Sequence, residues 1–133
     1  MKRIFALILV VCISVGLCAC SASMDDFKSN LGDDYKIITL SDRDLDDYAD
    51  LLYLDVSDYG VKSAIEAKHK QKSTSVVIIE CGSSSQAEQL SKDADDIVFL
   101  LEYTYGSRYS FDIKCEDSFV LFGESTAIND ALD

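Results

Sequence analysis

Beyond the first 20 residues, the side chains best suited to covalent chemistry are His69, Cys81 and Cys115. A thiol beside an imidazole can act as an activated nucleophile, because the imidazole takes up the thiol proton. His69, however, lies in a polar turn between two lysines, whereas each cysteine ends an apolar segment that is typical of a strand. We therefore expect a surface histidine and two small apolar core residues rather than a catalytic pair.

Closely spaced aspartates offer carboxylates that could hold a cation. Asp42, Asp44 and Asp46 resemble the first three ligands of an EF-hand loop, but the later positions of that loop are not matched. Asp47 stands where the loop needs glycine, and Tyr53 stands where it needs a bidentate glutamate. A solvated helix start explains the same residues, so the sequence predicts no metal site and no cofactor. The weak candidates for calcium that remain are Asp42, Asp46, Asp47 and Asp50.

Two other groups of side chains could bind a ligand. The basic group lies at a predicted hairpin tip, where it is either a solvated turn or a contact for an anionic polymer or headgroup. The aromatic group surrounds Gly106, where it is either an exposed patch or the rim of the core. These candidate binding residues are Lys68, Lys70 and Lys72 in the first group, and Tyr103, Tyr105 and Tyr109 in the second.

The amino terminus has the form of a secretory signal peptide. Lys2 and Arg3 give it a positive start, residues 4–19 are almost entirely apolar, and the first acidic residue is Asp25. An apolar segment of this length is short for a membrane-spanning helix, which needs about 20 residues. We expect residues 1–19 to be removed from the mature protein.

The end of this segment, Leu17-Cys18-Ala19-Cys20, resembles the bacterial lipobox. The resemblance implies transfer of diacylglycerol to the sulfur of Cys20, cleavage before Cys20, and acylation of the new amine, for example with palmitate. It makes the chain similar to small lipoproteins of Gram-positive bacteria, anchored to the cell membrane on its extracytoplasmic face. Two alternatives are cleavage by an ordinary signal peptidase after Ser21, and an uncleaved leader.

The net charge of the chain limits the kinds of partner that it is expected to bind. The sequence has 24 acidic and 12 basic residues, and without Lys2 and Arg3 the mature form carries a net charge of −14. Such a surface repels the phosphates of nucleic acids and anionic headgroups, so we expect no nucleic-acid partner. The expected partners are membrane lipid through Cys20 and an envelope protein or small ligand.

The hydrophobic pattern predicts alternating helices and strands. Ser41–Asp44 and Ser85–Glu88 resemble capping boxes that begin helices. The predicted helices cover 24–31, 41–54, 86–105 and 126–132, and the predicted strands cover 35–40, 61–68, 74–81, 108–115 and 119–122.

This order predicts one α+β domain over residues 24–133, after a short tether at 20–23. The central β-α-β-β-α-β order is that of the ferredoxin-like plait, here with an extra carboxyl-terminal strand and short helix. The alternative is a mixed sheet in which strands 74–81 and 108–115 are adjacent. The plait disfavours a Cys81–Cys115 disulfide, because strand 35–40 would separate the two residues by at least about 9.6 Å.

The sequence lacks the G-x-S-x-G, P-loop, G-x-G-x-x-G, C-x-x-C and H-E-x-x-H motifs. We therefore expect a non-enzymatic module that binds a protein or a small ligand near the membrane. The alternatives are an enzyme that uses aspartates alone or with a bound cation, and a calcium-dependent surface protein.

Overall fold

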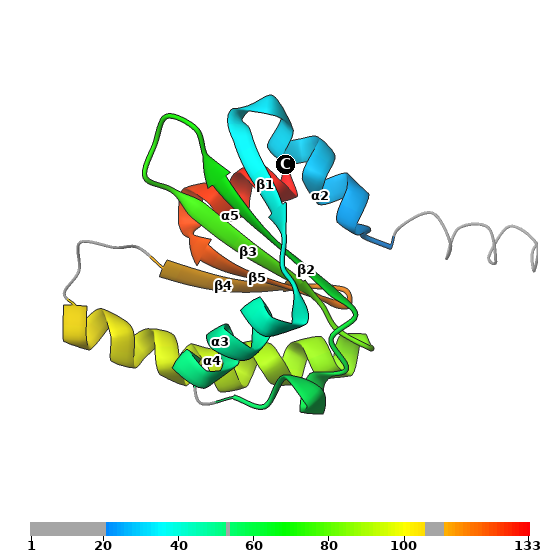
Figure 1. The fold of residues 1–133 in the computed structure, drawn as a ribbon, viewed down its shortest axis with the longest axis vertical. Coiled ribbons are helices and arrows are strands. Elements are labelled where there is room, and N and C mark those ends of the chain that lie inside the picture. Colours follow the sequence, from blue (N-terminus) through cyan, green and yellow to red (C-terminus); the bar gives the residue numbers. More distant parts are fainter. Residues whose placement is uncertain (1–20, 53, 106–110) are drawn as a thin grey trace, which may run out of the picture.

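A computed structural model describes residues 21–52, 54–105 and 111–133, with positions 48–49, 51–52 and 97–105 described in their backbone only. The elements are interleaved helices and strands, which confirms the α+β class (Figure 1). In chain order they are α2 (Met24–Leu31), the 3-10 helix η1 (Gly32–Asp34), β1 (Tyr35–Thr39), α3 (Asp42–Leu52), the 3-10 helix η2 (Val56–Tyr59), β2 (Ser63–His69), β3 (Ser75–Glu80), α4 (Ser84–Tyr105), β4 (Phe111–Glu116), β5 (Phe119–Glu124) and α5 (Ser125–Leu132).

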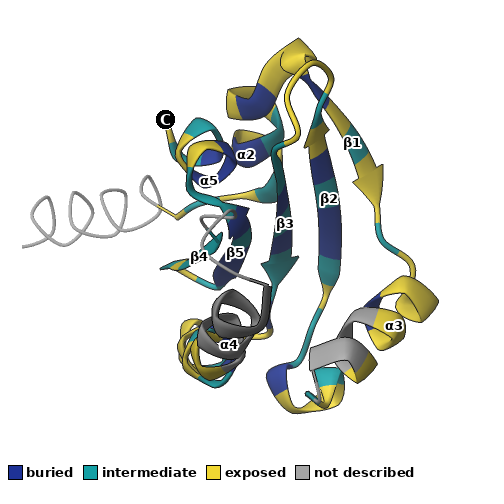
Figure 2. Ribbon diagram, turned by 90° about the vertical axis from the view of Figure 1, so that its left-hand side faces the viewer, coloured by how far each residue is buried: buried dark blue, intermediate teal, exposed yellow. Residues whose placement is uncertain are grey.

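The strands form one antiparallel sheet in the order β1-β2-β3-β5-β4. The predicted plait order is therefore wrong: β1 lies at an edge and pairs with β2, from Tyr35 opposite His69 to Thr39 opposite Ile65. In the plait, the helix after the first strand joins two parallel strands, whereas α3 joins β1 and β2, which pair with each other in antiparallel orientation. Among the α3 side chains that the structure describes, only Leu45 is buried. The helix packs against η2, beside the ends of β1 and β2 (Figure 2).

The mixed-sheet alternative is also wrong, because β5 lies between β3 and β4 and is antiparallel to both. Burial explains this order. Phe119, Val120 and Leu121 of β5 are buried in the sheet, whereas no residue of β4 is classed as buried. The more apolar strand thus takes the interior position and the more polar strand takes the edge.

The two faces of the sheet carry separate cores. Helices α2 and α5 pack together on one face, and α4 packs on the other face over β4 and β5 (Figure 1). The buried residues of the first core are Phe27, Leu31, Tyr35, Ile65, Ala67, Val76, Ile78, Phe119, Leu121, Ala127, Ile128 and Ala131. Those of the second core are Tyr59, Cys81, Ala87, Leu90 and Val120.

Hydrogen bonds of serine side chains fix three helix starts. Ser41 and Asp44 form the predicted capping box, in which the Ser41 amide donates to Asp44 Oδ2 at 2.8 Å and the Asp44 amide donates to Ser41 Oγ at 3.3 Å. The box predicted at Ser85 is wrong, since α4 begins two residues earlier and the amide of Gln86 donates to Ser83 Oγ at 3.2 Å. Ser23 caps α2 in the same way through Asp26.

Candidate functional site

His69 shapes the β2–β3 hairpin. Its Nδ1 atom accepts hydrogen bonds from the amides of Gln71 and Lys72, at 3.0 and 3.1 Å. Its ring packs edge-on against Tyr35, with 5.0 Å between the ring centroids. Cys81 follows the other end of β3, so the fold does not bring the histidine and this cysteine together.

Cys81 and Cys115 are free thiols on either side of β5. Cys81 is fully buried, and its amide donates to the carbonyl of Ser118 at 2.8 Å. Burial raises the pKa of the Cys81 thiol to about 11, and it raises the pKa of the half-buried Cys115 thiol as well. Both groups are therefore protonated near neutral pH, which makes them weak nucleophiles. One strand separates the two thiols, as in the plait, but it is β5 rather than β1.

The aspartates of α3 lie on its exposed side. Asp42 and Asp46 border an open hollow of about 350 Å³ between α3 and η2, together with Leu45, Val56, Ser57, Gly60 and Val61. Asp47 and Asp50 are exposed on the same helix. Within residues 21–52, 54–105 and 111–133, no three histidine, cysteine, aspartate or glutamate side chains are grouped so that they could hold a metal ion.

The three hairpin lysines lie in two different elements. Lys68 belongs to β2, where its Nζ atom lies 3.2 Å from Glu66 Oε1 on the same face of the sheet. Lys70 and Lys72 are exposed in the turn, and the Lys70 amide donates to the carbonyl of Asp34. Of the aromatic group, the Tyr103 and Tyr105 side chains and the whole of Tyr109 lie outside the described residues.

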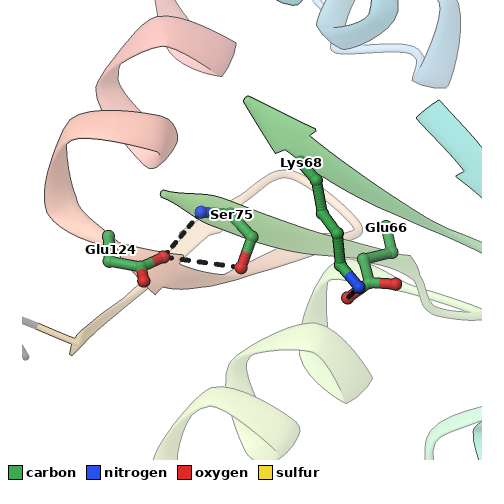
Figure 3. Close-up of polar contacts among 4 residues, drawn as sticks. All are labelled: Glu66, Lys68, Ser75 and Glu124. Carbon is green, nitrogen blue, oxygen red and sulfur yellow. Dashed lines mark hydrogen bonds and ion pairs between the residues drawn. The ribbon is translucent and has the colours of Figure 1, made fainter. Parts of the chain in front are cut away.

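The sequence did not reveal a polar row that crosses the sheet on the α4 face. Lys36 of β1 lies opposite Lys68 of β2, which lies opposite Ser75 of β3. The amide of Ser75 donates to Glu124 Oε2 of β5 at 2.7 Å (Figure 3). The next row places Ile38, Glu66, Val77 and Phe122 side by side. We call these eight residues the sheet patch.

The sheet patch combines charged and apolar groups. Ile38 is 40% exposed, whereas Val77, Phe122, Glu66 and Glu124 are partly buried. An apolar cavity of about 40 Å³ lies beside the patch, and Val77 and Phe122 form part of its wall. The other lining residues are Leu45, Ile79, Leu90, Ala94 and Val120.

The geometry of the patch fits binding better than activation of a hydroxyl. Ser75 Oγ lies 3.5 Å from Glu124 Oε2, which is long for an O–H···O hydrogen bond. The same carboxylate oxygen already accepts the much shorter bond from the Ser75 amide. The partly buried Glu124 side chain thus holds the start of β3. The sequence signal was the alternation of Lys36 with Ile38 and of Glu66 with Lys68, but only the strand order joins these pairs.

Comparisons with known proteins do not assign the chain to a family. No family model, no curated protein and no solved structure matches the chain. Across the described part of the chain, none of the helices has both the length and the apolar character needed to cross a bilayer.

Proposed function

We propose that this chain is a lipoprotein that Cys20 anchors at the extracytoplasmic face of a cell membrane. Leu17-Cys18-Ala19-Cys20 stands at the end of the apolar leader, as lipid transfer to a cysteine requires. The cysteine thiolate is the one side-chain group at this position that is nucleophilic enough near neutral pH. Diacylglycerol together with an amine-linked acyl chain holds a protein stably, because each buried methylene contributes about 0.8 kcal/mol.

Replacement of Cys20 tests this anchor. In Cys20→Ser, we expect an unprocessed precursor that carries no lipid, detected as a larger species on gels and by the loss of labelling with radioactive palmitate. Cys18→Ser is the matched control, because it changes a neighbouring cysteine at a position where serine is common in lipoboxes. Equal processing and labelling of wild type and Cys20→Ser would refute the anchor.

We further propose that the domain is a non-enzymatic binding module, with the sheet patch as its contact surface. Two lysines, two glutamates and Ser75 offer both signs of charge and hydrogen bonds, while Ile38, Val77 and Phe122 offer apolar area. Interfaces between proteins combine an apolar centre with a polar rim in this manner. A protein of the cell envelope is the partner that this mixed, shallow surface supports best.

Two substitutions that each introduce a negative charge test the patch. Lys36→Glu and Ile38→Asp should each abolish capture of the partner in crosslinking from envelope extract, without a change in thermal unfolding. Lys92→Glu, at an exposed position of α4, is the matched control and should leave capture unchanged. If all three variants capture the same proteins as the wild type, the patch is not the contact surface.

The positions of the α3 aspartates do not favour the aspartate-dependent alternatives. Asp42, Asp46, Asp47 and Asp50 are all exposed, and catalysis by paired carboxylates needs one of them to be buried enough to keep its proton. A calcium-dependent role would need several of these carboxylates to converge on one ion.

A further inference from the structure

Ala22, two residues after Cys20, already makes contacts with the folded domain. The amide of Ala22 donates to Asp117 Oδ2 at 2.7 Å, and the Ala22 side chain packs against the first core. The next residue, Ser23, is the N-cap of α2. Two residues of the tether predicted at 20–23, Ala22 and Ser23, therefore make contacts with the domain.

Asp117 is well placed to hold this segment. It lies with Ser118 in the tight turn between β4 and β5, and its φ of 52° is the one positive φ of a non-glycine residue in the described ranges. Glycine or asparagine would suit this backbone better, but glycine has no side chain that could reach Ala22. The aspartate here combines a strained backbone with a carboxylate that accepts the Ala22 amide.

This turn and the β2–β3 hairpin lie at opposite ends of the sheet. The Ser118 carbonyl accepts the amide of Cys81, so the β4–β5 turn is at the end where β3 finishes. The hairpin containing Lys70 and Lys72 precedes β3, and the six residues of β3 span about 20 Å. Figure 1 shows the hairpin on one side and the start of α2 on the other.

We infer that the lipid anchor holds the domain with its β4–β5 turn against the membrane and its β2–β3 hairpin directed away, and that the Asp117–Ala22 hydrogen bond sets this orientation. The inference rests on the proposed lipidation of Cys20. Two residues span at most about 7 Å, which leaves the domain little freedom to turn over. Lys70 and Lys72 then face a partner in the envelope rather than the lipid headgroups.

The charges at the two ends oppose this orientation on an anionic bilayer, so the short link to Cys20 has to hold it. Asp25, Asp26, Glu116 and Asp117 are exposed near the anchored end. An anionic bilayer repels these carboxylates and attracts Lys70 and Lys72 of the hairpin, so the orientation depends on the contact of Ala22 with Asp117 rather than on charge. The sheet patch includes Lys68 and Ser75, which border the hairpin, so its outer row is presented on the side away from the membrane.

Fluorescence quenching by lipid can measure the orientation. The full lipidated protein would carry a bimane label at Asp25→Cys or at Gln71→Cys, in a Cys115→Ser background that removes the half-buried thiol. It would be placed in vesicles of zwitterionic lipid with about 30% phosphatidylglycerol and a nitroxide-headgroup lipid. We expect the label at position 25 to be quenched at least three times as strongly as the label at position 71.

The outcomes separate the orientation from the anchor. Equal quenching at both positions, stronger quenching at position 71, or no quenching in protein that floats with the vesicles would overturn the orientation. Protein that lacks lipid and does not float with the vesicles would overturn the proposed function instead.

Two substitutions test the role of Asp117. Asp117→Gly suits the positive φ and removes only the carboxylate, so we expect folded protein that floats normally but loses the difference in quenching. Asp117→Asn retains an acceptor oxygen and should restore most of the difference. Faster hydrogen exchange of the Ala22 amide in Asp117→Gly would accompany the change. If Asp117→Gly keeps the wild-type ratio, the hydrogen bond does not set the orientation.

Discussion

The Tyr35 hydroxyl donates a 2.6 Å hydrogen bond to Asp130 Oδ2, although the two residues are 95 positions apart. It joins the edge strand β1 to the last helix, α5. Burial, followed by the bond to the Asp130 carboxylate, raises the pKa of Tyr35 to about 12. The edge strand of this sheet is thus held by a side chain on its inner face as well as by its pairing with β2.

Tyr35→Phe should destabilise the domain by about 1–3 kcal/mol at pH 7, because it removes a hydrogen bond to a charged acceptor. The folded wild type keeps the Tyr35 proton up to about pH 12, whereas the unfolded chain loses it near pH 10. Stability therefore falls as the pH rises from 10 to 12, and this fall should be shallower in Tyr35→Phe. Urea unfolding at several pH values measures both effects. A variant as stable as wild type at pH 7 would mean that the bond contributes nothing.

Ile78→Ala and Ile38→Ala compare two isoleucines of one sheet. Ile78 is fully buried in the first core, whereas Ile38 is 40% exposed on the opposite face. We expect Ile78→Ala to lower the free energy of unfolding by about 2–5 kcal/mol, through lost burial and the cavity that it leaves. Ile38→Ala should lower it by less than about 1 kcal/mol. If chemical denaturation shows similar losses of unfolding free energy in the two variants, the assignment of the two faces is contradicted.

We expect Gly123→Ala to destabilise the domain strongly, although it adds only one methyl group. A Cβ atom at position 123 would lie 2.2 Å from the Ser75 carbonyl oxygen and 2.8 Å from Val76 Cα, so β3 and β5 would have to separate. We expect the free energy of unfolding to fall by about 3 kcal/mol or more, which can be measured as a lower melting temperature. Gly32→Ala is the control: φ is +58° there, but no atom lies within 4 Å. Its ψ is −155°, a combination that essentially only glycine adopts, so backbone strain alone should cost about 1–3 kcal/mol. A milder effect at Gly123 than at Gly32 would refute the close approach of the strands.

The two domain thiols should differ in reactivity. Cys81 is buried and its pKa is raised to about 11, so iodoacetamide at pH 8 should modify it at least about tenfold more slowly than it modifies Cys115. Unfolding in guanidinium should make the two rates similar, which is the internal control. Peptide mapping by mass spectrometry gives both rates. Fast modification of Cys81 in the folded protein would show that the α4 side of the core opens readily.

The sequence predicted the elements well because each has a strong local signal. The positions of β3, α4 and α5 follow from apolar runs and helical spacing, and the observed ends differ by no more than two residues from those expected. The capping box at Ser41 is similarly local, since its two residues are three positions apart. At Ser83 the local rule failed, because several serines in a row offered equivalent starts.

Strand order, in contrast, depends on contacts that local patterns do not record. β5 was expected as a short partner strand, yet its run of Phe119, Val120 and Leu121 is more completely buried than any stretch of β4 and displaces that strand to the edge. The polar row from Lys36 to Glu124 appears only once four strands are aligned. The Asp117–Ala22 bond spans 95 positions and had no sequence signal.

We propose that the mature chain begins at a lipid-modified Cys20. Trypsin should release the peptide from Cys20 to Lys28, and mass spectrometry of this peptide from membranes tests the claim most directly. We predict a peptide that begins at Cys20 and carries the mass of diacylglycerol, with or without an amine-linked acyl chain. An unmodified peptide that begins at Cys20, or a chain that begins at any other residue, would contradict it.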